Sequence, residues 1–332
     1  VLTGEVSPSG HLPDTYAVSS VSSPAMVNFG SYTFTNATED NFGASNYSGS
    51  NYLVESEGIY TGYKYYETRY EDTVLKQGNA DSAAGASNDN GTWNYDEEVS
   101  YGFGYGLSYT TFEQNIKNFD YEGDSVTVSV EVKNTGDVAG KDVVQLYAQT
   151  PYTDYDKENK VEKSAVQLLD YEKTDMIEPG ESQTVTITAD AQDMASWDST
   201  CDNEAGTTGN WILDNGTYYF TVGNGAHEAV NNVLAAQDQK VDGNKDNVQT
   251  WELGDFDSSS FAVTLNGTPV ENQLQDADLN NWMEDTVTYL SRNDWEGTWP
   301  ETYKDLTATD EMISAMADDY SDIEANGDPS SV

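Results

Sequence analysis

The clearest pattern in the chain is a strict alternation of valines with polar residues over residues 125–133. Val126, Val128, Val130 and Val132 occupy every second position, and Thr, Ser and Glu stand between them. Side chains two residues apart lie on one face of a β-strand, so this pattern predicts a strand with one buried and one wet face. Further short strands are predicted at 143–148, 165–169 and 184–188, with turn residues at 134–137 and 178–181. Their lengths and spacing favour an all-β sandwich.

Two more strand predictions concern the later part of the chain. Asn215-Gly216 stands between two aromatic-rich stretches within residues 211–223. This dipeptide suits the positive φ angles of a tight turn, so it predicts a β-hairpin. Residues 231–250 are polar, and we expect the next strand only at 260–265, where it would close the sandwich.

The first part of the chain has a different character. Residues 1 to about 80 are rich in loops and contain a dense aromatic run at 59–66. Residues 77–91 are almost all Gly, Ala, Ser, Asn and Asp, which predicts a flexible connection or surface loop. This stretch is the first plausible domain boundary.

Composition excludes several classes of partner. The chain has 332 residues, enough for two or three domains, and 14 Lys and Arg against 59 Asp and Glu give a net charge of −45. Such a surface repels phosphate and anionic lipid, so we expect no nucleic acid and no membrane as partners. The single cysteine, Cys201, excludes an internal disulfide and leaves the compartment open, since a cytoplasmic and a secreted protein both fit.

Four motifs point to a known family. They are Pro-Ser-Gly-His-Leu-Pro-Asp-Thr at 8–15, Glu-Gly-Ile-Tyr-Thr-Gly-Tyr-Lys-Tyr-Tyr at 57–66, Tyr-Gly-Phe-Gly-Tyr-Gly-Leu-Ser-Tyr-Thr-Thr-Phe at 101–112, and Asn-Thr-Gly-Asp-Val-Ala-Gly-Lys at 134–141 followed by Pro-Gly-Glu-Ser at 179–182. In this order they resemble glycoside hydrolase family 3, with Lys64 where the family commonly has Arg. The resemblance covers roughly residues 4 to 225.

The resemblance implies a fold class and a division into domains. We expect a mainly β chain, in which an incomplete remnant of the family's α/β sandwich domain at 1–99 precedes an immunoglobulin-like or fibronectin type III-like β-sandwich at 100–265. Residues 266–332 would then be a connector, partly disordered, toward a catalytic TIM-like barrel missing from this chain. Tyr289–Thr298 resembles the connector of family members with reversed domain order, in which the barrel follows the sandwich.

The resemblance also implies a function. Family members are mostly β-glucosidases that use retaining chemistry, which needs two carboxylates about 5 to 5.5 Å apart. The family's nucleophile lies on the barrel and its acid/base Glu lies upstream of the Pro-Ser-Gly motif, so both appear to fall outside this chain. We therefore expect a non-catalytic scaffold and domain brace, whose partners are the barrel of the same protein and, in the full-length parent, a β-glucoside. No cofactor is expected.

One aspartate could be mistaken for the nucleophile. Residues 287–295 superficially resemble the family's Ser-Asp-Trp motif, which would make Asp294 catalytic. A polar loop precedes this stretch, and the residues after it are too few for a barrel of about 250 residues. We therefore expect no catalytic residue here.

The aromatic run offers candidates for sugar binding. Glu57, Tyr60 and Tyr63 could line a cleft, because aromatic faces pack on sugar CH groups while carboxylates bond hydroxyls. The alternative, which we favour, is that these tyrosines pack a domain edge with their hydroxyls in water.

Metal binding is not expected. His11 and His227 are the only histidines, and with Cys201 they lack the spacing of a zinc site. Residues 242–247 begin like a calcium loop, but Asn247 replaces the required Gly and Leu253 stands where a bidentate Glu is needed. We interpret them as an acidic solvated loop.

Another class of function remains open. The chain would also suit a stand-alone fibronectin III-like module that binds a carbohydrate or a protein without chemistry. The neighbouring coding sequence distinguishes the two, because an enzyme requires eight β/α units beyond this stretch.

Overall fold

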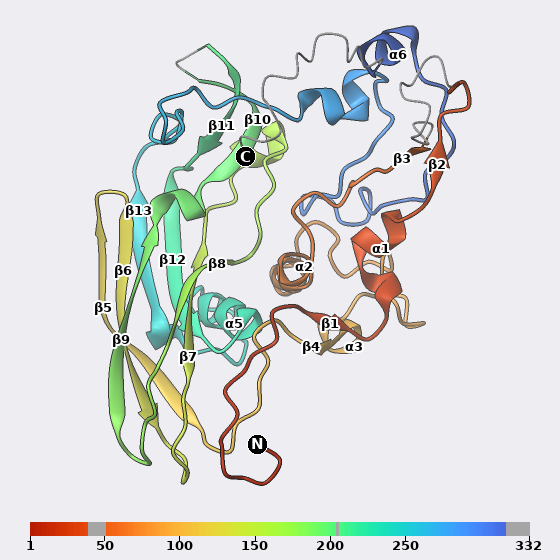
Figure 1. The fold of residues 1–332 in the computed structure, drawn as a ribbon. Coiled ribbons are helices and arrows are strands. Elements are labelled where there is room, and N and C mark those ends of the chain that lie inside the picture. The colour runs from red at the N-terminus through yellow and green to blue at the C-terminus, as the bar shows by residue number, and fades with distance from the viewer. Residues whose placement is uncertain (39–50, 204–205, 317–332) are drawn as a thin grey trace, which may run out of the picture.

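A two-sheet β-sandwich occupies one side of the molecule (Figure 1). The computed structural model describes residues 1–38, 51–203 and 206–316. One sheet has the order β5-β6-β9 and the other β13-β12-β7-β8, and all neighbouring strands are antiparallel. Their bounds are β5 Phe112–Glu122, β6 Ser125–Asn134, β7 Val143–Gln149, β8 Gln167–Lys173, β9 Ser182–Asp190, β12 Gly216–Gly223 and β13 Val248–Leu253. The predicted sandwich and its strands at 125–133, 143–148 and 184–188 are confirmed.

The alternating valines form the centre of the sandwich core. All four valines of β6 are 0% exposed, and Val128 stands opposite Ile187 in the neighbouring strand β9. The other sheet contributes Leu146 and Phe220, both fully buried, to the same cluster. Burial of aliphatic and aromatic side chains from both inner faces is the main stabilising contribution to this fold.

The predicted hairpin at 211–223 is wrong, although both of its strands exist. Trp211 belongs to β11 (Thr208–Ile212), which pairs with β10 (Ser196–Asp202), whereas Gly216 begins β12 and pairs with Leu253. Between these strands the buried Asp214 forms an ion pair with Lys163. This pair holds the chain where it crosses from one sheet to the next, so the Asn-Gly dipeptide does not close a hairpin.

A helix was missed in the stretch that looked merely polar. Helix α5 (Ala226–Ala236) packs beside β12 and α2, and its buried residues follow the spacing of a helical face. They are Ala226, Ala229, Val230, Val233 and Leu234, all 0% exposed.

The strand expected at 260–265 is also wrong. That stretch holds an isolated bridge from Val263 to Pro269, and Leu265 is fully exposed. The sandwich is instead extended by β13, whose Trp251 stacks on Tyr121 with ring centroids 4.0 Å apart. Residues 242–247 lead into β13 and include the short 3-10 helix η3 (Lys245–Asn247).

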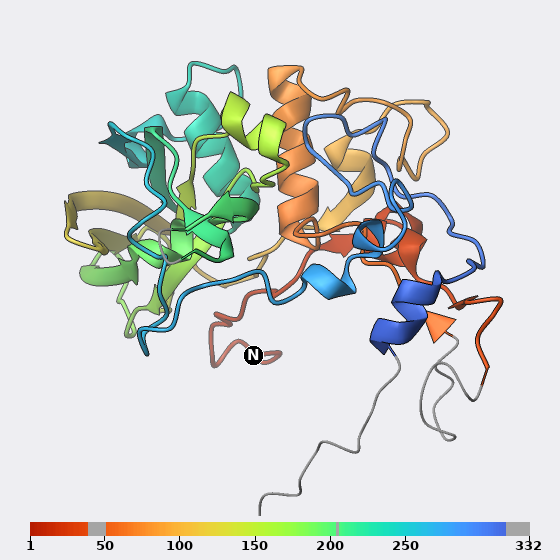
Figure 2. The same ribbon diagram turned by 90° about the horizontal axis from the view of Figure 1, so that it is seen from above.

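The second body of the molecule is built around helix α2 (Tyr63–Leu75). Figure 1 looks along this helix, and Figure 2 shows it upright beside the sandwich and α5. Around it lie short elements, namely η1 Ser20–Ser22, α1 Pro24–Asn28, α3 Tyr95–Glu98 and the two-stranded ribbons β1 (Tyr16–Ala17) with β4 (Val99–Tyr101) and β2 (Tyr32–Thr33) with β3 (Asn51–Tyr52). Assignment of residues 1–99 to the tail of an α/β sandwich stays a prediction.

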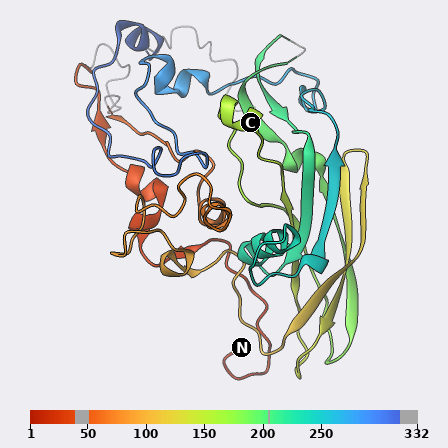
Figure 3. The same ribbon diagram turned by 180° about the vertical axis from the view of Figure 1, so that it is seen from behind.

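Residues 279–316 pack onto this second body. Leu290 and Trp295 are buried in one cluster with Tyr60 and Tyr65, and Met312 of α6 (Asp310–Met316) is buried against Phe34. Figure 3 shows this blue stretch beside the orange-red elements α1 and β2, away from the marked N-terminus. Residues 279–316 of the predicted connector therefore belong to the fold around α2, and residues 317–332 lie outside the described residues.

The described residues form a mixed structure rather than a mainly β one. Strands make up 29% of them and helices 20%, with antiparallel sheets. The remaining elements are α4 (Asp154–Asn159) and the 3-10 helices η2 (Ala191–Met194), η4 (Gln275–Ala277) and η5 (Leu279–Asn281). Within the described ranges, no helix has the length and apolar character needed to cross a membrane.

Truncating Phe220 should strongly destabilise the sandwich. Phe220 is 0% exposed and its ring centroid lies 5.0 Å from that of Phe119. We expect Phe220→Ala to lower the free energy of unfolding by about 3 to 5 kcal/mol, because it leaves a cavity between the sheets. Thr217→Ala on the same strand should cost less than about 1 kcal/mol. Urea denaturation measures both, and equal losses would contradict the assigned core.

Candidate functional site

Both arginines of the chain are buried where the segments of the second body meet. Arg292 is 6% exposed and Arg69 is 0% exposed. The Arg292 Nη2 atom lies 2.8 Å from Oε2 of Glu71 and 2.5 Å from Oδ1 of Asp72. Since α2 presents these two carboxylates on consecutive residues, one guanidinium can bond both.

Further contacts connect this ion pair to two other segments. The Asp72 Oδ2 atom also accepts a hydrogen bond of 2.8 Å from the Trp295 indole nitrogen. The Arg292 backbone N–H donates to Oε2 of Glu162, 3.2 Å away, in the loop between α4 and β8. We call these five residues, Glu71, Asp72, Glu162, Arg292 and Trp295, the Arg292 cluster. It joins α2, the loop before β8 and residues 290–299.

Burial controls the electrostatics of the cluster. Desolvation raises the pKa values of the Glu71 and Asp72 carboxyls above their ordinary values, although Arg292 offsets part of the shift. Burial opposes the charge on Arg292, but the Asp72 and Glu71 carboxylates outweigh it and raise its pKa well above the ordinary value. Each charged group therefore depends on the other for its ionised form.

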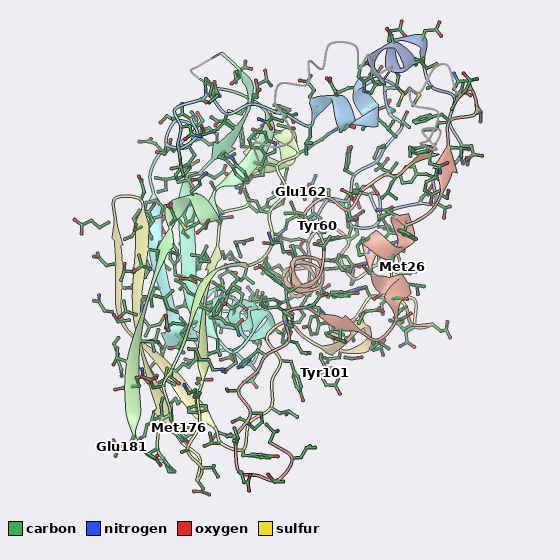
Figure 4. All side chains as sticks on the ribbon, in the orientation of Figure 1. Met26, Tyr60, Tyr101, Glu162, Met176 and Glu181 are labelled. Carbon is green, nitrogen blue, oxygen red and sulfur yellow. The ribbon has the colours of Figure 1, made fainter. Side chains whose placement is uncertain are left out.

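Each of the three residues predicted for a sugar cleft contacts other parts of the protein. Tyr60 is 0% exposed, donates its hydroxyl to Glu162, and packs edge-on against Trp295 (Figure 4). Glu57 is 8% exposed and accepts a hydrogen bond from the Asn28 amide. Tyr63 packs on Phe103 and accepts a hydrogen bond from the backbone of Leu168. All three have protein partners here, and their role in a sugar cleft stays a prediction.

Asp294 has a local structural role. Its Oδ1 atom accepts hydrogen bonds of 3.0 Å from the Gly297 backbone and 3.1 Å from the Asn79 amide. It therefore stabilises the turn that follows Trp295 and ties it to the end of α2.

A second buried arginine fixes the same segment from another side. The Arg69 Nε atom donates to the Ala80 carbonyl at 2.8 Å, and its guanidinium lies 5.0 Å from the ring centroid of Trp93 and 5.6 Å from that of Trp299. Aromatic faces attract a desolvated cation, so Arg69 holds Trp93 and Trp299 together beside α2.

The loop before β8 anchors the second body to the sandwich. Lys163, 4% exposed, forms a 2.9 Å ion pair with Asp156 and a second ion pair with Asp214 at the crossing between β11 and β12. Its neighbour Glu162 belongs to the Arg292 cluster. Two adjacent residues thus connect the two bodies of the molecule.

The two consecutive carboxylates of this cluster are both engaged by one guanidinium. Glu71 and Asp72 are buried and both bonded to Arg292. Among residues 1–38, 51–203 and 206–316, no group of three or more His, Cys, Asp or Glu side chains could hold a metal ion.

The Arg292 cluster was missed because its members are far apart in sequence. A signal existed in the composition, since only two of the 14 basic residues are arginines. Arginine is the cation suited to buried ion pairs, so its rarity marks both positions as structural candidates.

In comparisons with known proteins, this chain is similar to β-glucosidases. The fibronectin type III-like domain family matches residues 142–226. A β-glucosidase of Ruminococcus albus is 33% identical over 280 residues, covering 83% of this chain and 21% of the enzyme. The chain is homologous to glycoside hydrolase family 3 β-glucosidases over part of their length, including the fibronectin type III-like domain.

Solved structures agree in fold. A β-glucosidase from Paenibacillus barengoltzii has a TM-score of 0.51 and 28% identity, over 77% of this chain and 21% of that protein. The β-glucosidase 3B of Thermotoga neapolitana, determined in complex with glucose, has a TM-score of 0.50 and 26% identity, over 77% of this chain and 26% of that protein. The chain spans between 21% and 26% of these relatives' lengths.

Removing Arg292 should be far more costly than removing a surface cation. Arg292→Leu leaves Glu71 and Asp72 buried without a counter-charge, so we expect a loss of about 3 to 5 kcal/mol in the free energy of unfolding. Lys117→Met is the matched control, because Lys117 is half exposed in its pair with Glu131 and should cost less than about 1 kcal/mol. A loss in Arg292→Leu no greater than in Lys117→Met would sink the assignment.

The penalty in Arg292→Leu should depend on pH. A carboxyl with a higher pKa in the folded than in the unfolded state favours folding at low pH, and this contribution is lost as pH rises through the folded pKa. Without Arg292, the raised pKa values of Glu71 and Asp72 should rise further. The difference in unfolding free energy between parent and variant should therefore narrow as pH falls from 7 toward about 4, near the ordinary carboxyl pKa. Denaturation across this range measures it, and a constant difference would contradict the mechanism.

Proposed function

We propose, from the homology of this chain to part of the glycoside hydrolase family 3 β-glucosidases, that it is the non-catalytic scaffold and domain brace of such an enzyme. The full-length parent would hydrolyse terminal β-linked glucosyl residues with retention. The residues around α2 would belong to the tail of an α/β sandwich domain, and a TIM-like barrel of the same protein would supply the nucleophile.

The Arg292 cluster is the observation that carries this proposal. A brace must hold segments from different parts of the chain at fixed positions, and the cluster joins residues more than 200 positions apart through buried charges. Residues 289–298, which resemble the connector to the barrel, are anchored on α2 by Arg292 and Trp295. A barrel attached through this segment would therefore start from a fixed point.

The placement of Asp294 supports the absence of a catalytic role. Its carboxylate is committed to a turn, and the neighbouring Arg292 and Trp295 are buried. A retaining glycosidase needs a second carboxylate about 5 to 5.5 Å away across an open cleft. Asp294 instead faces amide donors.

Hydrolysis by the purified chain is the direct test. We expect no release of nitrophenol from p-nitrophenyl β-glucoside above the rate without protein, and Asp294→Asn should change nothing. A longer product of the same gene that contains a barrel is the positive control. Turnover by the chain alone that disappears in Asp294→Asn would overturn the proposal.

The neighbouring coding sequence distinguishes this proposal from the alternative function, a stand-alone binding module. Reading frames that continue into eight β/α units support the brace. A stop codon or a cell-wall anchor beside this stretch supports the module instead.

A further inference from the structure

Both histidines of the chain line one open groove, although they are 216 positions apart. The groove has a volume of about 650 Å³, within the range of small-ligand sites. Its walls come from residues 8–11, 95–112, 141–142 and 224–228. We call it the histidine groove.

Close backbone packing shapes the groove. Residues 10–12 run beside 104–106, with hydrogen bonds of 2.8 Å from Leu12 N to Tyr105 O and 2.9 Å from Gly104 N to Leu12 O. Gly104 has φ of +87°, and a Cβ there would meet the Asn224 carbonyl oxygen at 2.5 Å. This loop therefore passes tightly between the N-terminal segment and the start of α5.

Each imidazole is held in one tautomer. Nδ1 of His11 lies 2.6 Å from the Gly104 carbonyl oxygen, which can only accept, so this nitrogen carries the proton. Nδ1 of His227 lies 2.8 Å from the buried carboxylate of Glu67. The ring of His227 is further fixed by stacking on Tyr95, with ring centroids 4.2 Å apart.

Aromatic faces and carboxylates complete the lining. Tyr101 and Tyr105 have ring centroids 4.7 Å apart and are 48% and 42% exposed, and Figure 4 marks Tyr101 at the end of β4. Asp142 and Glu228 add carboxylate acceptors. The polar lining thus combines these acceptors with hydroxyl, amide and ammonium donors such as Ser108, Asn224 and Lys141, beside partly exposed aromatic rings.

This chemistry selects the class of ligand. A net charge of −45 repels anions, and Lys141 in the lining opposes a compact cation. A neutral polyhydroxy molecule suits this lining, because its hydroxyls both donate and accept hydrogen bonds while its CH faces pack on tyrosine rings. We propose that the histidine groove binds a neutral oligosaccharide. This inference does not depend on the proposed scaffold function.

Titration with two sugars and an amine tests the proposal. The intact chain is titrated by calorimetry with cellotetraose, maltotetraose and spermidine. We expect saturable binding of at least one sugar, weakened about tenfold in Tyr101→Ala and in Tyr105→Ala through the lost aromatic contact. Tyr171→Ala is the matched control, because Tyr171 is 61% exposed on β8, outside the groove, and should leave affinity unchanged.

Several outcomes would overturn the proposal. They are no sugar binding up to about 10 mM, saturable binding of spermidine alone, or sugar binding that survives both groove variants. Circular dichroism of each variant verifies that a lost signal does not reflect unfolding. Hydrolysis of p-nitrophenyl β-glucoside is measured separately. Failure of sugar binding would therefore not contradict the scaffold proposal, and hydrolysis by the chain would not support sugar binding in the histidine groove.

Discussion

The structure depends on one buried guanidinium that faces two consecutive carboxylates. Placing Arg292, Glu71 and Asp72 away from water costs free energy, which their mutual pairing and their hydrogen bonds to neighbouring residues offset. If residues 290–299 took another path, the carboxylates of Glu71 and Asp72 would stay buried without a counter-charge. Alternative placements of this segment are therefore strongly disfavoured. This constraint fixes the path of residues 290–299 over α2 and brings Trp295 into the aromatic core around Tyr60 and Tyr65.

The scarcity of basic residues gives this constraint its specificity. In a chain with a net charge of −45, any exposed cation has many alternative partners, and most surface pairs contribute little. Both arginines are instead enclosed, one by carboxylates and the other by tryptophan rings. The acidic surface maintains solubility through repulsion, while the few buried cations select one arrangement of the segments.

Local sequence patterns predicted the sandwich, but they could not predict contacts between residues that are far apart in the sequence. The valines of β6 alternate with a period of two, so their buried face follows from the sequence alone. The apolar residues of helix α5 recur with an equally clear helical period. Its asparagines make the stretch resemble a polar loop, and the helix was not predicted. The Asn215-Gly216 turn failed because Lys163, about fifty residues earlier, binds Asp214 and directs the chain into another sheet. The Arg292 cluster and the pairing of the two histidines in one groove depend on contacts across 200 residues, which no local pattern encodes.

Glu162 and Lys163 stand next to each other and bond to opposite bodies of the molecule. Glu162 accepts from Tyr60 and from the backbone of Arg292, while Lys163 pairs with Asp156 and Asp214 in the sandwich. Because a single peptide unit separates these anchors, the sandwich cannot swivel about α2 without breaking buried ion pairs on one side. The two bodies should consequently move as one rigid unit, so that a displacement of one also displaces the other.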